Sequence, residues 1–262
     1  MTLTLHYVRL FKELLITDLI LLKQKLGDTI LNTLIWVTSI TLAATYVLPK
    51  LGMMQSYGSM VLIGSIASCG IFEIFGNASI MVADLDGERT ISYQLTLPLP
   101  GWILLAQKAV SYAIHSAILT LFIIPIGKLI MQDHFVLSAI QPVKFIIAYV
   151  MLHLMCGFFS LVMTAYTSNM GNILNVWVRG LFPMWFFGGS QFNWYTLKSI
   201  SPWLGYINLA NPLVYAFEGI KGASLPDGSF LPFAICIPMM AFFSVVFLFI
   251  AHKKLQSRLD YL

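Results

Sequence analysis

Charged side chains are scarce in this sequence: Asp, Glu, Lys and Arg make up 10% of the 262 residues, whereas 58% are hydrophobic. A soluble domain carries about 25% charged residues, and a chain with far fewer cannot cover a surface that faces water. The composition therefore predicts an integral membrane protein in contact with a lipid bilayer. It argues against a soluble enzyme, and the small net charge of +4 argues against a nucleic-acid partner.

Cysteine is also rare. The three cysteines, Cys69, Cys156 and Cys236, each lie inside an apolar run. An odd number of buried cysteines predicts no disulfide framework.

The signatures of bond-making chemistry are missing. The sequence contains no Gly-x-x-x-x-Gly-Lys-Ser/Thr phosphate loop, no His-Glu-x-x-His zinc motif and no Gly-x-Ser-x-Gly nucleophile elbow. We therefore expect a chain that is not catalytic by itself and that binds no cofactor and no metal. If ATP drives this protein, another chain hydrolyses it.

Long apolar runs dominate what is present. A membrane-spanning helix needs about 20 mostly apolar residues, and six runs qualify: residues 30–48, 57–83, 102–131, 145–168, 173–189 and 231–251. Open strands cannot exist in hydrocarbon, so these runs predict helices. The expected fold is an all-α membrane protein with six transmembrane helices in one domain, residues 1–262.

The first 27 residues have a different pattern. Apolar side chains recur there at steps of three or four residues: Val8, Phe11, Leu15, Leu19, Leu22 and Leu26. This spacing places them on one face of a helix, opposite a basic face. Residues 1–27 are therefore predicted to form an amphipathic helix that lies in the membrane interface. A cytosolic helix packed on a partner is the alternative.

Residues 190–230 are apolar but interrupted. The stretch 203–217 contains Asn208, Asn211 and Pro212, and it is too short to span comfortably. We expect re-entrant or surface helices on the extracytoplasmic side, before the last span.

The distribution of basic residues predicts the orientation. With six spans, both termini share a side that holds ten Lys and Arg residues, and the other side holds five. The positive-inside rule then places both termini in the cytoplasm.

The connection between the second and third spans, residues 84–101, is the longest predicted cytoplasmic loop. Its acidic residues Asp84, Asp86 and Glu88 suit the start of a helix. Leu95, Leu97 and Leu99 are apolar although the loop faces water. An amphipathic helix with an apolar edge predicts a docking surface for another protein; a helix lying on the bilayer is the alternative.

Two motifs and the layout together resemble the permease subunit of a type-2 ABC exporter. The first motif runs from Glu88-Arg89-Thr90 through Leu95, Leu97 and Pro98 to Lys108. It resembles the Glu-Arg-x-x-Gly-Thr…Leu-x-x-x-Pro…Lys stretch of that family, without the Gly-Thr pair. The second motif contains Asn211, Pro212, Tyr215 and Glu218. It resembles an Asn-Pro-x-x-Tyr…Glu…Arg segment, with Lys221 in place of Arg.

The resemblance implies a division of labour between subunits. Such permeases form dimers around a translocation pathway, and a separate ATPase subunit carries ATP and Mg. Transferred to this chain, Glu88, Arg89 and residues 95–98, which include Leu95, Leu97 and Pro98, would contact the ATPase. The resemblance also implies a bacterial inner membrane, in which this chain would be a multi-pass protein.

Polar residues inside the spans are further candidates. Ser65, Cys69, Glu73 and Asn77 recur every four residues and form one stripe. His115 and His153 on the next two spans are possible partners of Glu73. The stripe is expected either to face the translocation pathway or dimer seam, or to serve helix packing. The alternative function is a stand-alone secondary carrier or channel that uses Glu73 for proton coupling.

Overall fold

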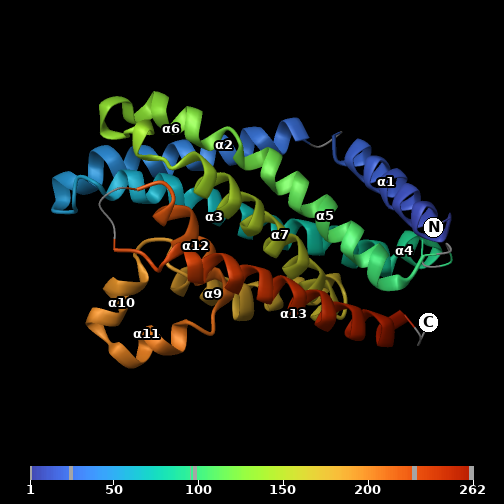
Figure 1. Cartoon of the computed structure of the whole chain (residues 1–262). Helices are drawn as coiled ribbons and strands as arrows, with labels where there is room; N and C mark the ends of the chain where they lie inside the picture. Colours follow the sequence, from blue (N-terminus) through green and yellow to red (C-terminus); the bar gives the residue numbers. More distant parts are fainter. Residues whose placement is uncertain (1, 24–25, 95, 97–98, 226–228, 260–262) are drawn as a thin grey trace.

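The protein is described by a computed structural model that covers residues 2–23, 26–94, 96, 99–225 and 229–259. Every regular element in these ranges is helical, which confirms the predicted all-α fold. Figure 1 shows an elongated helical bundle in which segments far apart in sequence lie side by side.

Five helical segments in the described part of the chain are long and apolar enough to cross a membrane. They are Leu26–Leu51, Tyr57–Asp86, Gly101–His134, Pro142–Tyr166 and Phe233–Ser257. They contain α2 (Leu26–Leu42), η1 (Ala43–Val47), η2 (Leu48–Leu51), α3 (Tyr57–Asp86), α5 (Gly101–Thr120), α6 (Ile123–Met131), η3 (Gln132–His134), α7 (Pro142–Tyr166) and α13 (Phe233–Leu259). These segments correspond to five of the six predicted apolar runs.

The remaining run, residues 173–189, is not one uninterrupted apolar helix. It consists of short pieces, α8 (Ile173–Val176), the π-helix η6 (Trp177–Leu181) and α9 (Phe182–Phe187), and η5 (Met170–Asn172) directly precedes them. We call residues 170–187 the broken segment. Asn175 and Arg179 lower its hydropathy and Pro183 removes a backbone donor, so it is not among the five membrane-length segments.

The broken segment nevertheless runs antiparallel to α3. At its start, the Met170 N–H donates to the Asp86 carboxylate at 3.0 Å, near the C-terminal end of α3. Near its end, the Trp185 Nε1–H donates to the Ser68 hydroxyl at 3.0 Å. The segment therefore runs along α3, and its crossing of the membrane stays a prediction.

Helix α3 lies in the core of the bundle and packs against α2, α5, α7 and α12 (Pro212–Gly222). Its residues 61–71 are buried on every side, because apolar and small residues surround the whole helix. Helices α5 and α7 also approach closely. A Cβ at Gly157 would lie 2.2 Å from the Ala109 carbonyl oxygen, so the small residue at this position permits the contact.

The two ends of the bundle carry different elements. Figure 1 places the start of α1 (Thr2–Lys23), the short helix α4 (Thr90–Gln94) and the end of α13 at one end. The shorter helices α10 (Trp194–Ile200) and α11 (Pro202–Asn208) lie at the other end. The predicted interruption between residues 208 and 212 is present, because α11 ends at Asn208 and α12 begins at Pro212.

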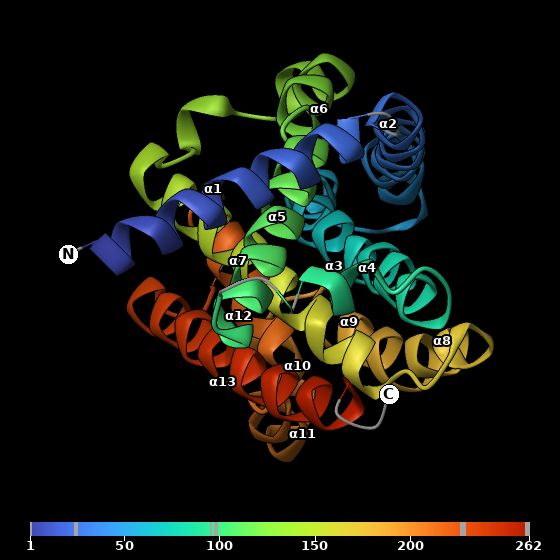
Figure 2. The ribbon, with the colours of Figure 1, turned by 90° about the vertical axis from the view of Figure 1, so that its right-hand side faces the viewer.

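Helix α1 lies across its end of the bundle, as Figure 2 shows. Phe11, Leu15 and Leu22 are half-buried on its inner face, as predicted, whereas Val8 is 65% exposed. Residues 24–25, at the end of the predicted interfacial helix, lie outside the described residues. The location of α1 at a membrane surface stays a prediction.

Candidate functional site

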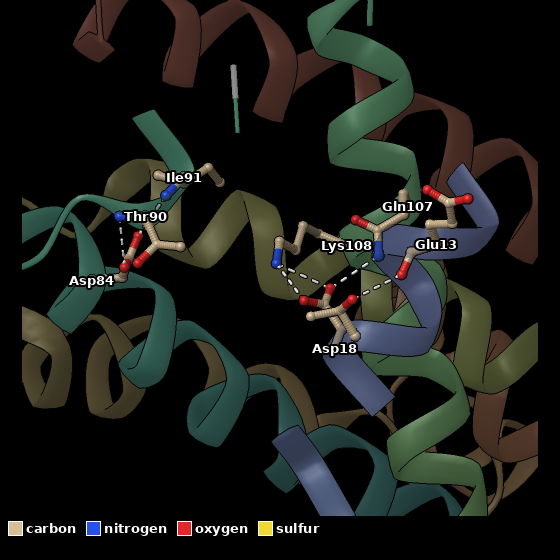
Figure 3. Close-up of polar contacts among 8 residues, drawn as sticks. Glu13, Asp18, Asp84, Thr90, Ile91, Gln107 and Lys108 are labelled. Atoms are coloured by element: carbon tan, nitrogen blue, oxygen red, sulfur yellow. Dashed lines mark hydrogen bonds and ion pairs between the residues drawn. The ribbon is translucent and has the colours of Figure 1, made fainter. Parts of the chain in front are cut away.

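Asp84 organises the turn between α3 and α4. Its carboxylate accepts hydrogen bonds from the backbone N–H groups of Thr90 at 2.9 Å and Ile91 at 3.0 Å (Figure 3). The Asp84 carbonyl accepts a third from the Arg89 N–H at 2.7 Å. These bonds satisfy donors that the first turn of a helix leaves free. Asp84 thus has the helix-start role predicted for the acidic residues of this loop.

The residues of the predicted docking loop fall into two groups. Glu88 and Arg89 are exposed between α3 and α4, whereas Leu95, Leu97 and Pro98 lie outside the described residues. Helix α4 has only five residues. Leu99 is buried and is not part of an exposed edge. The large hydrophobic side chain that α4 exposes is Tyr93, which is 71% accessible.

A half-buried ion pair attaches α1 to α5. Lys108 Nζ lies 2.8 Å and 3.0 Å from the two carboxylate oxygens of Asp18, and Gln107 Nε2 donates to Asp18 at 2.9 Å. Figure 3 shows the three side chains converging between the two helices. The carboxylate and ammonium side chains are only 12% and 15% exposed. Sequence reasoning missed Asp18, although it shares a helical face with Phe11, Leu15 and Leu22.

A pocket of about 210 Å³ joins these two features. Residues from α1, α3, α4 and α5 line it, among them Asp18, Asp84, Ile91, Lys108 and Tyr112. The α3–α4 turn and the α1–α5 attachment therefore belong to one assembly at this end of the bundle, which we call the terminal site.

The polar residues predicted inside the spans form two separate groups. Glu73 on α3 lies near His115 on α5, with 3.4 Å between Glu73 Oε2 and His115 Nδ1. His153 on α7 is not a partner of Glu73. Its two ring nitrogens lie 2.5 Å from the Ser116 hydroxyl and 2.9 Å from the Thr120 hydroxyl.

The two groups differ in how well they are satisfied. His153 has a hydrogen-bond partner at each nitrogen, so its network holds α5 and α7 together. By contrast, Asn77 Oδ1 on α3 and Ser111 Oγ on α5 are buried without a hydrogen-bond partner among the described residues, and the polar contact of the His115 ring is the 3.4 Å approach of Nδ1 to Glu73.

The second motif forms a brace at the other end of the bundle. Asn211 caps α12 by accepting from the Leu213 N–H at 3.1 Å, and Pro212 occupies the first helical position. The Asn211 side chain also donates to the Met184 carbonyl at 2.7 Å, which attaches α12 to the broken segment. The Tyr215 hydroxyl donates to the Leu209 carbonyl at 2.8 Å.

Glu218 is the buried centre of this brace. Its carboxylate accepts from the backbone N–H groups of Trp194 at 2.7 Å and Leu231 at 2.8 Å, and the residue is 1% exposed. Burial raises the pKa of Glu218, whereas these two bonds and the charge of Lys221 oppose that rise. Glu218 thus joins α12 to the segments on either side of it.

Lys221, one turn further along α12, is completely buried. Its ammonium group donates to backbone carbonyls of the loop after the broken segment: Gly189 at 2.5 Å, Phe192 at 3.3 Å and Ser190 at 3.4 Å. Burial lowers the pKa of Lys221, and the charge of Glu218 opposes this. Gly189 has a φ of +98°, a conformation that glycine adopts without strain.

The helical fold of the described residues and their five membrane-length segments define an all-α, multi-pass membrane protein. Residues 21–225 match the ABC-2 type transporter family. The chain belongs to that family and is an ABC transporter permease, which confirms the resemblance seen in the sequence. A comparison with curated proteins found no match.

Proposed function

We propose that the chain is the permease subunit of an ATP-driven exporter. Two copies form the translocation pathway, and a separate ATPase subunit binds the terminal site. The proposal rests on one observation: Glu88 and Arg89 are exposed on the turn between α3 and α4.

The backbone of Arg89 supports a role outside the chain. Its φ is +57°, a left-handed conformation that costs about 1–2 kcal/mol for a residue with a Cβ. A glycine would adopt it freely. The Arg89 side chain is exposed, so its packing within the chain does not account for an arginine here. Binding of the Arg89 side chain to a partner protein accounts for the arginine.

The terminal site also provides a route for force. Asp84 attaches α4 to α3, and the Asp18–Lys108 pair attaches α1 to α5. A displacement of α4 or α1 by a closing ATPase dimer therefore reaches two helices of the bundle. In this mechanism the chain catalyses no reaction, and ATP and Mg are bound by the ATPase.

The orientation follows from the same assignment. The end that carries α1, α4 and the end of α13 faces the cytoplasm, where ATP is available. The chain is then a multi-pass protein of the bacterial inner membrane with both termini inside, and residues 190–230 lie on the extracytoplasmic side.

The proposal is tested by isolating the tagged chain in mild detergent from its native cell and assaying it for ATP hydrolysis. We expect an ATPase subunit to copurify. In that complex, Glu88→Ala is expected to lower ATP hydrolysis because an exposed docking carboxylate is lost. Arg89→Gly is expected to lower it too, while thermal stability stays equal or rises because backbone strain is relieved.

Asp133→Ala is the matched control, because Asp133 is an exposed carboxylate in η3, at the end of the bundle away from the terminal site. It should leave hydrolysis unchanged. Normal hydrolysis in both Glu88→Ala and Arg89→Gly would remove the docking assignment. A chain that purifies alone and without ATPase activity would favour a stand-alone carrier or channel that uses Glu73.

A further inference from the structure

Arg179 occupies an unusual position in the broken segment. It is exposed on the surface of the bundle and makes no ion pair with another described residue. It lies in the π-helix η6, within one of the six segments that run along the bundle. A charged residue at such a place needs an explanation.

The contacts of the broken segment with α3 give the depth of Arg179. Met170 lies beside Asp86, and a Cβ at Gly64 would lie 3.1 Å from the Ser190 carbonyl oxygen. The 22 residues of α3 between these two levels extend about 33 Å, close to the thickness of the hydrocarbon core, about 30 Å. Arg179 lies nearly midway in sequence between Met170 and Ser190, so it belongs to the middle of the membrane and not to the cytoplasmic side, where the count of basic residues had placed it.

The exposed face around Arg179 has two halves. Asn172, Asn175 and Arg179 are exposed and follow one another at steps of three or four residues. Phe182 and Phe186 continue the same spacing and are 44% and 45% exposed. The broken segment therefore presents a polar half toward the α3–α4 end and an aromatic half beyond it.

Lipid is an unfavourable environment for this face. An arginine at the centre of a bilayer costs about 2.5–3.5 kcal/mol even on the lowest scales, and intramembrane charges face the bundle interior or a water-filled cavity. Arg179 does not face the interior of its own chain. A water-filled path between two copies satisfies the arginine, and the aromatic half can line the same path.

We infer that this face lines the translocation pathway and that Arg179 binds an anionic oxyacid group of the transported substrate, such as a phosphate, sulfate or carboxylate. The guanidinium is planar, always charged, and matches such oxygens with paired donors. Phe182 and Phe186 provide contacts for a ring or apolar part of the same molecule. This inference rests on the proposed function, because it requires two copies around a path.

Accessibility to charged thiol reagents tests the inference without a known substrate. Phe182→Cys is made in the full chain, purified with its ATPase and placed in nanodiscs. It is treated with anionic methanethiosulfonate ethylsulfonate or cationic methanethiosulfonate ethyltrimethylammonium. Phe242→Cys is the matched control, because Phe242 is a 57% exposed phenylalanine on α13. The unsubstituted chain, whose three cysteines are buried, gives the background.

We expect Phe182→Cys to react with both reagents and Phe242→Cys with neither. Adding Arg179→Gln should lower the ratio of the anionic to the cationic rate about tenfold, because a fixed positive charge concentrates anions locally. An unreactive Phe182→Cys, or a ratio that Arg179→Gln leaves unchanged, would overturn the inference. The ATPase activity of the same samples reports separately on the proposed function, because it does not depend on reagent access.

Discussion

Glu218 and Lys221 show how opposite charges are accommodated inside this chain. Each is satisfied mainly by backbone groups: two N–H donors for the carboxylate and three carbonyl acceptors for the ammonium. A buried charge without such partners is costly. The two residues therefore fix the positions of the segments before and after α12.

Glu218→Gln tests this interpretation. A glutamine oxygen can accept from only one of the two N–H groups, and its amide would oppose the other donor. The variant also removes the charge opposite Lys221. We expect a loss of about 3–5 kcal/mol in the free energy of unfolding, measured by titration with sodium dodecyl sulfate in mixed micelles.

The double variant Glu218→Gln/Lys221→Met provides the control. Because the two side chains belong to one buried assembly, their losses should not add, and the double variant should lose less than the sum of the single ones. Additive losses would show that the two residues act independently.

At the residue scale, the sequence predicts some of these roles and not others. The sequence predicts a break at Asn211 and Pro212, and in the structure these residues cap and begin α12. The sequence does not predict the partners of Lys221, because they are backbone carbonyls about thirty residues away in the chain, which any residue type supplies. For the same reason the proximity of Glu73 to His115, and not to His153, required the packing of α5 against α3.

The polar attachment of α1 to the bundle consists of one set of contacts, made by Asp18. Few elements besides α5 touch this helix, and the Asp18 bonds to Lys108 and Gln107 are its described polar links to the bundle. An amphipathic pattern predicted the helix. It did not predict what holds it, because Asp18 is an exception to the apolar face on which it lies.

Lys108→Met should loosen α1. The Asp18 carboxylate would remain partly buried with only Gln107 as a partner, at a cost of about 1.5–3 kcal/mol. This corresponds to amide hydrogen exchange about ten- to a hundredfold faster in α1, measured by mass spectrometry, with α3 unchanged.

Lys12→Met is the comparison, because Lys12 is an exposed lysine on α1 itself. It should leave exchange in α1 as it is in the unmodified chain. Equal protection of α1 in Lys108→Met would mean that apolar contacts alone hold the helix.

The broken segment is the element that hydropathy describes least well. Its apolar residues predicted a span, but a window average does not register a π-helix. In this π-helix Trp177 packs against Phe72 and Phe75 of α3. Pro183 and Arg179 were visible in the sequence, and together they mark a helix that is neither straight nor wholly apolar.

For the whole molecule, the broken segment decides the topology. If it crosses the membrane, the chain crosses six times and both ends of the described chain lie on one side. Figure 1 shows the start of α1 and the end of α13 at the same end of the bundle, as six crossings require.

Single cysteines on either side of the broken segment test this. Asn172→Cys and Ser199→Cys place thiols at exposed positions near the start of the segment and after its end. A membrane-impermeant maleimide added to intact cells with a permeabilised outer membrane should label Ser199→Cys. It should reach Asn172→Cys only in inverted vesicles. Labelling of both from the same side would mean that the segment does not cross.

The unpartnered polar atoms between α3 and α5 have a consequence for how the bundle changes shape. Each buried group without a hydrogen bond carries a penalty of about 1–3 kcal/mol, and Asn77 on α3 and Ser111 on α5 each have such an atom. The His153 network between α5 and α7 carries no such penalty, because both ring nitrogens have a hydrogen-bond partner. A movement that separates α3 from α5 would therefore break fewer of the described polar contacts than one that separates α5 from α7.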